Sequence, residues 1–159
     1  MKAKDIFYLV ASIIVCQLAG IVGGIFTASS VGTWYAGLTK PSFNPPNWIF
    51  SPVWISLYLL MGIALFLVLR KGFGSPGVRI AVALFACQLV LNALWSFLFF
   101  GLKAPFVAFL EIVVLWLFIV VTMVKFFKVS RAAGILLAPY LLWVSFASVL
   151  NFFLWSLNR

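Results

Sequence analysis

Histidine is absent from this chain of 159 residues, and only two residues are acidic, Asp5 and Glu111. The usual general base, metal ligand and axial haem ligand are therefore missing together. A mechanism that needs two carboxylates would have to bring them together from distant helices. These absences argue against a metal site, and we expect no obligatory cofactor.

Charge is also scarce, because charged residues make up 8% of the chain, apolar residues 66%, and the mean hydropathy is +1.25. A soluble domain of this size needs more charge on its surface, so the composition indicates an integral membrane protein. The net charge of +9 does not predict a nucleic-acid partner, because no basic face or recognition motif is present. The basic residues lie between apolar runs, where they contact lipid headgroups and set topology.

Cysteine occurs only twice, as Cys16 and Cys87, and both lie inside apolar runs. We expect both to be small buried side chains. Lys2 and Lys4 precede an apolar run that is too long for a typical signal peptide. That run is therefore predicted to be the first membrane span.

Apolar segments of about 20 residues, long enough to cross a bilayer as helices, recur along the chain. The predicted spans are about 6–28, 52–69, 80–101, 104–124 and 132–157. The fold class is all-α integral membrane, a single five-helix domain over 1–159. Only the first extramembrane loop, about 29–51, is long, and long loops usually have a function. No internal repeat supports an inverted-repeat transporter.

Basic residues are unevenly divided between the two ends of the predicted bundle. Eight lie on the side of the N-terminus: Lys2, Lys4, Arg70, Lys71, Arg79, Lys125, Lys128 and Arg131. Three lie on the other side: Lys40, Lys103 and Arg159. The positive-inside rule then predicts a cytoplasmic N-terminus in a plasma or inner membrane, with the long loop outside.

Aromatic and polar side chains recur at helical spacing inside three spans. Trp54 and Tyr58 are four residues apart and share one face. Similar stripes run through Gln88, Asn92, Trp95 and Phe99, and through Tyr140, Trp143, Ala147 and Asn151. Amides are costly in hydrocarbon, so they are expected to face protein or a cavity. If the stripes converge, they form a pocket for a large, flat, mostly apolar ligand. The alternative is that the aromatics are interface anchors and the amides interhelical contacts.

Two further features have more than one interpretation. For Glu111, the favoured interpretation is a carboxyl near Lys103 that pairs or hydrogen-bonds locally. The alternative is that Glu111 takes part in a proton or cation relay. The small-residue pattern Gly20-x-x-x-Gly24 allows close helix approach. That approach is either packing within the chain or a homodimer face.

Three stretches carry a resemblance to the TspO/MBR family of translocator proteins. They read WYAGLTKPSFNPPNWIFSPVW at 34–54, LNALWSFLFFG at 91–101 and LAPYLLWVSFASVLN at 137–151. The resemblance covers essentially the whole chain. It implies a five-helix bundle, often a homodimer in membrane lipid, that binds porphyrins such as protoporphyrin IX and haem, and in some members sterol or benzodiazepine-type ligands.

The resemblance also implies which residues contact the ligand. Carried over by motif, they are Trp34, Lys40, Trp54, Tyr58, Asn92, Trp95, Tyr140, Trp143 and Ala147. Trp54 and Trp143 match tryptophans implicated in light-dependent porphyrin breakdown by some bacterial members. High-affinity sterol binding is in doubt, because Phe152 lacks the hydroxyl of the animal pattern and Arg159 is too far along the chain.

The leading hypothesis is therefore a tetrapyrrole-binding membrane protein that senses, carries or disposes of porphyrin. The second is a photooxidative porphyrin-degrading enzyme that places its ligand without acid–base groups. The third and fourth are a small-solute transporter and a stress-response scaffold.

Overall fold

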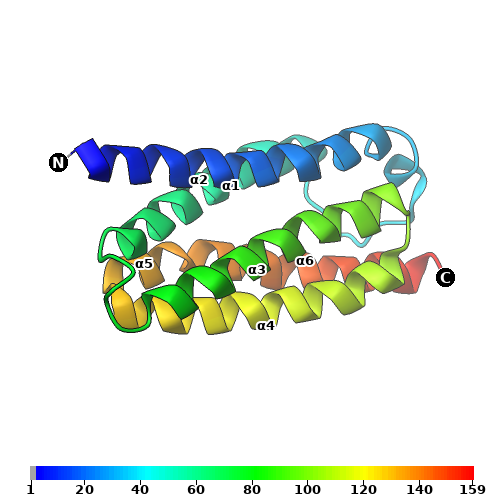
Figure 1. Ribbon diagram of the computed structural model, residues 1–159. Coiled ribbons are helices and arrows are strands. Elements are labelled where there is room, and N and C mark those ends of the chain that lie inside the picture. Colours follow the sequence, from blue (N-terminus) through cyan, green and yellow to red (C-terminus); the bar gives the residue numbers. More distant parts are fainter. Residues whose placement is uncertain (1–2) are drawn as a thin grey trace.

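The computed structural model describes residues 3–159, and among these it contains helices joined by loops and no strand. The long helices lie side by side along one axis (Figure 1). The elements are α1 (Ala3–Ser30), α2 (Asn47–Leu69), α3 (Val78–Ser96), a π-helical turn (Phe97–Gly101), α4 (Pro105–Val129), α5 (Arg131–Leu136) and α6 (Ala138–Leu157). Five segments are long and apolar enough to cross a membrane, α3 being continued by the π turn and α5 by α6. This confirms the predicted all-α membrane fold.

Local sequence explains where the helices start and stop. Pro46 directly precedes α2, and Pro105 is the first residue of α4, where a missing N–H removes no helical hydrogen bond. In the connection between α2 and α3, Gly72 and Gly77 have φ of 82° and 81°. Only glycine adopts that backbone readily, so the chain reverses there within a few residues.

The structure moves three predicted boundaries. Helix α2 begins at Asn47, so Trp48 is on its first turn, not in the loop. Helix α4 runs to Val129, beyond the predicted end of the fourth span at about 124, so Lys125 is helical. The last span is interrupted at Leu137, between α5 and α6. A helix satisfies its own backbone hydrogen bonds, so the membrane favours helical structure in the apolar spans. Aromatic and lysine residues tolerate helical backbone, so α2 starts earlier and α4 ends later than predicted.

Helices α1 and α2 pack closely because glycine lets them approach. An added Cβ on Gly62 would lie 2.8 Å from the Cα of Ile13, and one on Gly20 would lie 2.6 Å from the Tyr58 ring. Gly24 has no atom within 4 Å of that position. The Gly20 half of the predicted small-residue pattern therefore packs within the chain, whereas Gly24 is open.

The two cysteines differ in environment. Cys16 is fully buried between helices, as predicted. Cys87 is exposed on the outward face of α3, so its predicted burial is wrong. A lone apolar run does not reveal which face of a helix turns inward, and this is why the prediction failed for one of the two.

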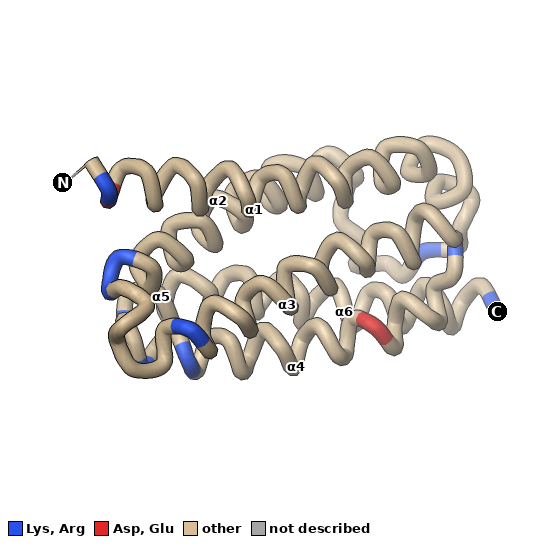
Figure 2. Tube along the Cα trace, in the orientation of Figure 1, with Lys and Arg blue, Asp and Glu red and all other residues tan. Residues whose placement is uncertain are grey.

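The described basic residues gather mainly at the N-terminal end of the bundle (Figure 2). Lys2, one of the eight predicted for that side, lies outside the described residues. Glu111 is buried in α4, and neither carboxyl oxygen has a hydrogen-bond partner among the described residues. The predicted local hydrogen bonding of Glu111 is therefore wrong, since its helical position turns the carboxyl towards the core.

Candidate ligand-binding pocket

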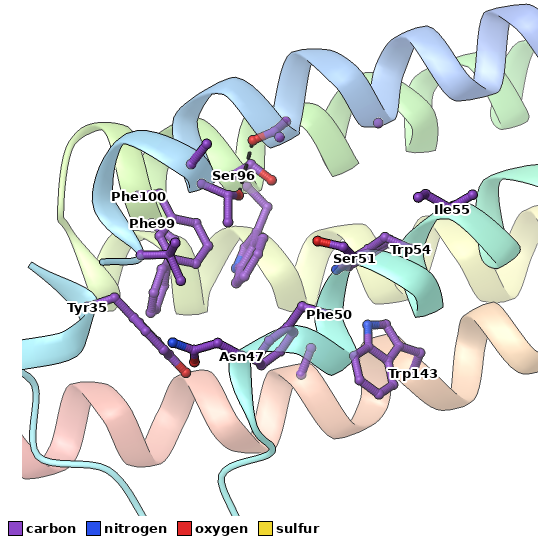
Figure 3. A pocket seen from close by; sticks show the side chains of 18 of the residues that line it. Tyr35, Asn47, Phe50, Ser51, Trp54, Ile55, Ser96, Phe99, Phe100 and Trp143 are labelled. Atoms are coloured by element: carbon purple, nitrogen blue, oxygen red, sulfur yellow. Dashed lines mark hydrogen bonds between the residues drawn. The ribbon is translucent and has the colours of Figure 1, made fainter. Parts of the chain in front are cut away.

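A cavity of about 420 Å³ lies in the loop-side half of the bundle. Residues of α1, α2, α3, the π turn and α6 line it, and Tyr35 of the first loop contributes at its end (Figure 3). A volume of this order is typical of small-molecule sites. The three spans that carry the predicted stripes, α2, α3 and α6, therefore do converge on one cavity.

The α2 wall is built from stacked aromatic rings. Trp54 and Tyr58 stack with their ring centroids 5.5 Å apart and their planes 28° apart. Gly20 of α1 lies directly against the Tyr58 ring, where any side chain would collide with it. The absence of a side chain at Gly20 therefore sets how far Tyr58 lies from α1.

The α6 wall adds Trp143 and Ala147. Trp143 meets Phe50 of α2 edge to face, with centroids 6.1 Å apart. This contact closes the seam between α2 and α6 beside the cavity. The small Ala147 leaves room next to the larger indole, as its place in the predicted stripe suggested.

The π-helical turn gives the third wall two consecutive inward-facing rings. Phe99 and Phe100 both line the cavity and are both buried. The wider turn is closed by the Leu102 N–H, which donates to the Phe97 carbonyl at 2.8 Å. Such turns are frequent at functional sites. Trp95 stacks on Phe99 at 5.2 Å, so the indole and the phenyl ring form one continuous face.

A chain of buried hydrogen bonds supports the wall from behind. The Tyr58 hydroxyl donates to Asn92 Oδ1 in a short bond. Asn92 Nδ2 donates to the Tyr140 hydroxyl at 2.9 Å, which donates to Gln88 Oε1 at 2.8 Å. One bond joins α3 to α2, and the other two join α3 to α6. The chain therefore ties together the three helices that carry the stripes.

Trp95 is held by a second set of bonds. Its indole N–H donates to Asn151 Oδ1 at 3.0 Å, and Asn151 Nδ2 donates to the Pro105 carbonyl at 2.8 Å. That carbonyl lies in the first turn of α4, so α3, α4 and α6 meet at one amide. Asn151 thereby fixes the plane of Trp95.

The first loop folds over the end of the cavity. Tyr35 is buried, and its hydroxyl donates to Asn44 Oδ1 at 2.7 Å. Burial raises the pKa of Tyr35 above its ordinary value, and the Asn44 bond offsets this in part. The hydroxyl therefore stays protonated at neutral pH and remains a donor. Lys40 Nζ donates to the carbonyls of Ala36 and Leu38 at 3.0 and 3.1 Å.

The end of α6 clamps the same loop. The Thr39 N–H donates to Asn158 Oδ1 at 2.8 Å, while Asn158 Nδ2 donates to the Thr39 carbonyl at 2.9 Å. One side-chain amide thus pairs with both backbone groups of one residue. We call loop residues 31–46 the lid, because they cover the cavity and are fixed to the bundle at this point.

The predicted ligand contacts fall into three groups. Trp54, Tyr58, Trp95, Trp143 and Ala147 line the cavity. Asn92 and Tyr140 lie behind the wall, in the hydrogen-bond chain. In the lid, Lys40 bonds to backbone carbonyls and Trp34 packs against Phe99 with centroids 5.6 Å apart. All nine thus belong to the cavity, its support or its cover, and ligand contact by each stays a prediction.

Sequence reasoning missed the α1 side of the cavity. Gly20, Gly23 and Gly24 line it together with Gln17 and Ile21. Small residues carry no aromatic or polar signal, and their pattern was interpreted only as helix packing. Phe99 was in a predicted stripe but was not chosen, and Phe100 was in none of the predicted stripes.

No charged side chain is among the residues that line the cavity. Among residues 3–159 there is also no cluster of His, Cys, Asp or Glu that would hold a metal ion. The cavity offers aromatic faces, a few hydroxyls and amides, and neutral electrostatics. Its shape and aromatic faces suit a flat apolar molecule, and no His, Asp, Glu, Lys or Arg side chain lines it.

A five-span helical membrane protein with one neutral aromatic cavity under a lid is the class that the fold and the site define. The pattern of the TspO/MBR family matches residues 12–156, and the chain belongs to that family. The family assignment confirms the resemblance carried by the three motifs.

Relatives from distant organisms match nearly the full length. The tryptophan-rich protein TspO of Chlorobaculum tepidum is 48% identical over 98% of both chains. That of Archaeoglobus fulgidus is 46% identical over 97% of this chain and 99% of its own. The human translocator protein is 37% identical over 90% of this chain and 85% of its own.

Replacing Asn92 by Leu should destabilise the bundle by about 1–3 kcal/mol, because the buried Tyr58 hydroxyl loses its acceptor. Tyr58→Phe should also destabilise, since it leaves Asn92 Oδ1 unpaired. The double variant should lose less than the sum, because both partners are then removed. Equilibrium unfolding in mixed micelles measures this, with Ser56→Ala, an exposed hydroxyl on α2, as control. Free-energy changes of the two single variants that are strictly additive in the double variant would contradict the hydrogen bond between Tyr58 and Asn92.

Replacing Asn158 by Ala should loosen the lid, because Thr39 loses both of its side-chain partners. Hydrogen exchange of the Thr39 amide should accelerate about tenfold, as expected for a loss of roughly 1.4 kcal/mol. Asn158→Asp keeps the acceptor and should show a smaller increase. Exchange at Thr39 that is equal in all three proteins would show that the clamp does not hold the lid.

Proposed function

We propose that this protein binds a tetrapyrrole, such as protoporphyrin IX or haem, in the cavity beneath the lid. The observation that carries the proposal is the convergence of Trp54, Trp95 and Trp143, from three different helices, on one uncharged cavity. Indole faces stack on large flat rings, and each such contact contributes about 0.5–1.5 kcal/mol beyond burial. The bound ring would then serve porphyrin sensing, transport or disposal.

The same residues favour binding by shape and stacking rather than by axial ligation. The chain contains no histidine, and so lacks the commonest axial ligand of haem. A metal-free ring should therefore bind about as well as haem. The ring's carboxylates have no cation in the cavity wall, so we place them at the edge, where Lys40 of the lid would exchange its carbonyl partners for a carboxylate.

A second candidate function is light-dependent porphyrin breakdown. It is favoured by the position of Trp54 and Trp143, which both line the cavity and so would both lie against a bound ring. The ring would absorb light and transfer the energy to dissolved oxygen, which then oxidises the ring, while a nearby indole traps radicals. Illuminated absorbance that falls no faster with the protein than in lipid alone would exclude this function.

Titration with protoporphyrin IX tests the leading proposal. In nanodiscs we expect saturable quenching of tryptophan fluorescence and a shifted Soret band. Replacing Trp54 and Trp143 together by Phe should weaken binding about tenfold, as expected from roughly 1.4 kcal/mol of lost stacking. Trp48→Phe is the matched control, because Trp48 is 73% exposed and is not among the residues that line the cavity. Non-saturable quenching, or equal affinity in all variants, would refute the proposal.

A further inference from the structure

Some residues that line the cavity are also exposed on the outside of the bundle. Ile21 on α1 and Ile55 on α2 both line it, yet they are 59% and 60% exposed. Gly24 and Ala28 of α1 and Ser51 of α2 share this double exposure. The cavity therefore opens sideways between α1 and α2. We call these five residues the α1–α2 window.

Two other seams around the cavity have contacts across them. Between α1 and the end of α3, Gly23 lies against Ser96, and Phe26 meets Phe97 edge to face at 5.2 Å. Slightly further along, the Ser30 hydroxyl donates to the Phe100 carbonyl at 2.8 Å. The α2–α6 seam is covered by the contact of Phe50 with Trp143. Side chains therefore meet across both of these seams.

Helices α1 and α2 themselves are in close contact below the window and at its lower edge. Gly62 meets Ile13 there, and Gln17 Nε2 donates to the Ile55 carbonyl at 3.1 Å. Towards the lid, Gly24 has no neighbouring atom within 4 Å of an added Cβ. Gly20, one turn beyond Gln17, still lies against the Tyr58 ring, so the seam is tight up to Gly20 and open beyond it.

We propose that the α1–α2 window is the passage through which a flat, mostly apolar ligand moves between the hydrocarbon of the membrane and the cavity. The inference rests on the proposed function, because it needs a ligand in the cavity. Both helices are membrane spans, so the outer side of the window faces lipid. An apolar ligand concentrates in that lipid and crosses an apolar rim without gaining water.

The alternative passage, through the lid, is obstructed. Opening the lid breaks the two bonds between Asn158 and Thr39 that fasten it to the end of α6. The window has no such bonds to break above Gln17. It is bounded by two isoleucine side chains and by glycine, whose missing side chain leaves the aperture free.

Two glycines offer matched variants, because neither Gly24 nor Gly37 has an atom within 4 Å of an added Cβ and neither has a positive φ. Gly24→Leu fills the window, whereas Gly37→Leu adds the same side chain to the lid. Leucine is also a better helix former than glycine, so α1 should keep its fold. Ile55→Ala widens the window.

The experiment measures the rates of protoporphyrin IX binding and release by stopped-flow fluorescence, with the porphyrin supplied in vesicles to protein in nanodiscs. Gly24→Leu should slow both rates about tenfold, the effect of a barrier raised by about 1.4 kcal/mol. Ile55→Ala should accelerate both, and Gly37→Leu should leave both unchanged. The dissociation constant should change far less than the rates.

Three results would overturn the passage. One is slower binding in Gly37→Leu with normal rates in Gly24→Leu, which would assign entry to the lid. Another is a weaker affinity in Gly24→Leu with an unchanged association rate, which would make Gly24 part of the wall only. Absence of saturable binding in the unsubstituted protein would overturn the proposed function and the passage together, whereas the first two results presuppose saturable binding and overturn the passage alone.

Discussion

Inside a membrane a polar side chain has no water to bond to, and the architecture of this protein depends on that constraint. The buried chain from Tyr58 through Asn92 and Tyr140 to Gln88 pairs polar groups of α2, α3 and α6 with one another. Because each group needs its partner, the three helices are held in one register. The cavity wall lies on the surface of the three helices that these bonds hold in place.

The same constraint explains why the cavity is neutral and aromatic. The polar atoms of Tyr58 and Trp95 are used inside the bundle, by Asn92 and Asn151, so their rings present mainly π faces to the cavity. Rings held by such bonds lose little further freedom when a ligand arrives. Pairing is not complete, however, because Glu111 and Gln88 Nε2 lack partners among the described residues.

Proline and the end of α6 give the lid its form. Pro41, Pro45 and Pro46 each fix φ and remove an amide donor, which limits the conformations of the segment between Lys40 and α2. Asn158 then fixes Thr39, more than a hundred residues away in the chain. A stiff segment with one clamp closes the aqueous end of the cavity at small entropic cost, whereas the side between α1 and α2 has no comparable fastening.

The sequence by itself determined the membrane class, the five spans and the three stripes that meet at the cavity, because hydropathy and helical periodicity are local properties. It also placed Trp54, Tyr58, Trp95, Trp143 and Ala147 on inward faces. Only the tertiary structure decided that Asn92 and Tyr140 stand behind the wall, that the π turn brings in Phe100, and that glycines of α1 form the remaining side. These features depend on which helix lies beside which, and on space that a missing side chain leaves. The periodicity of a single helix predicts neither of these.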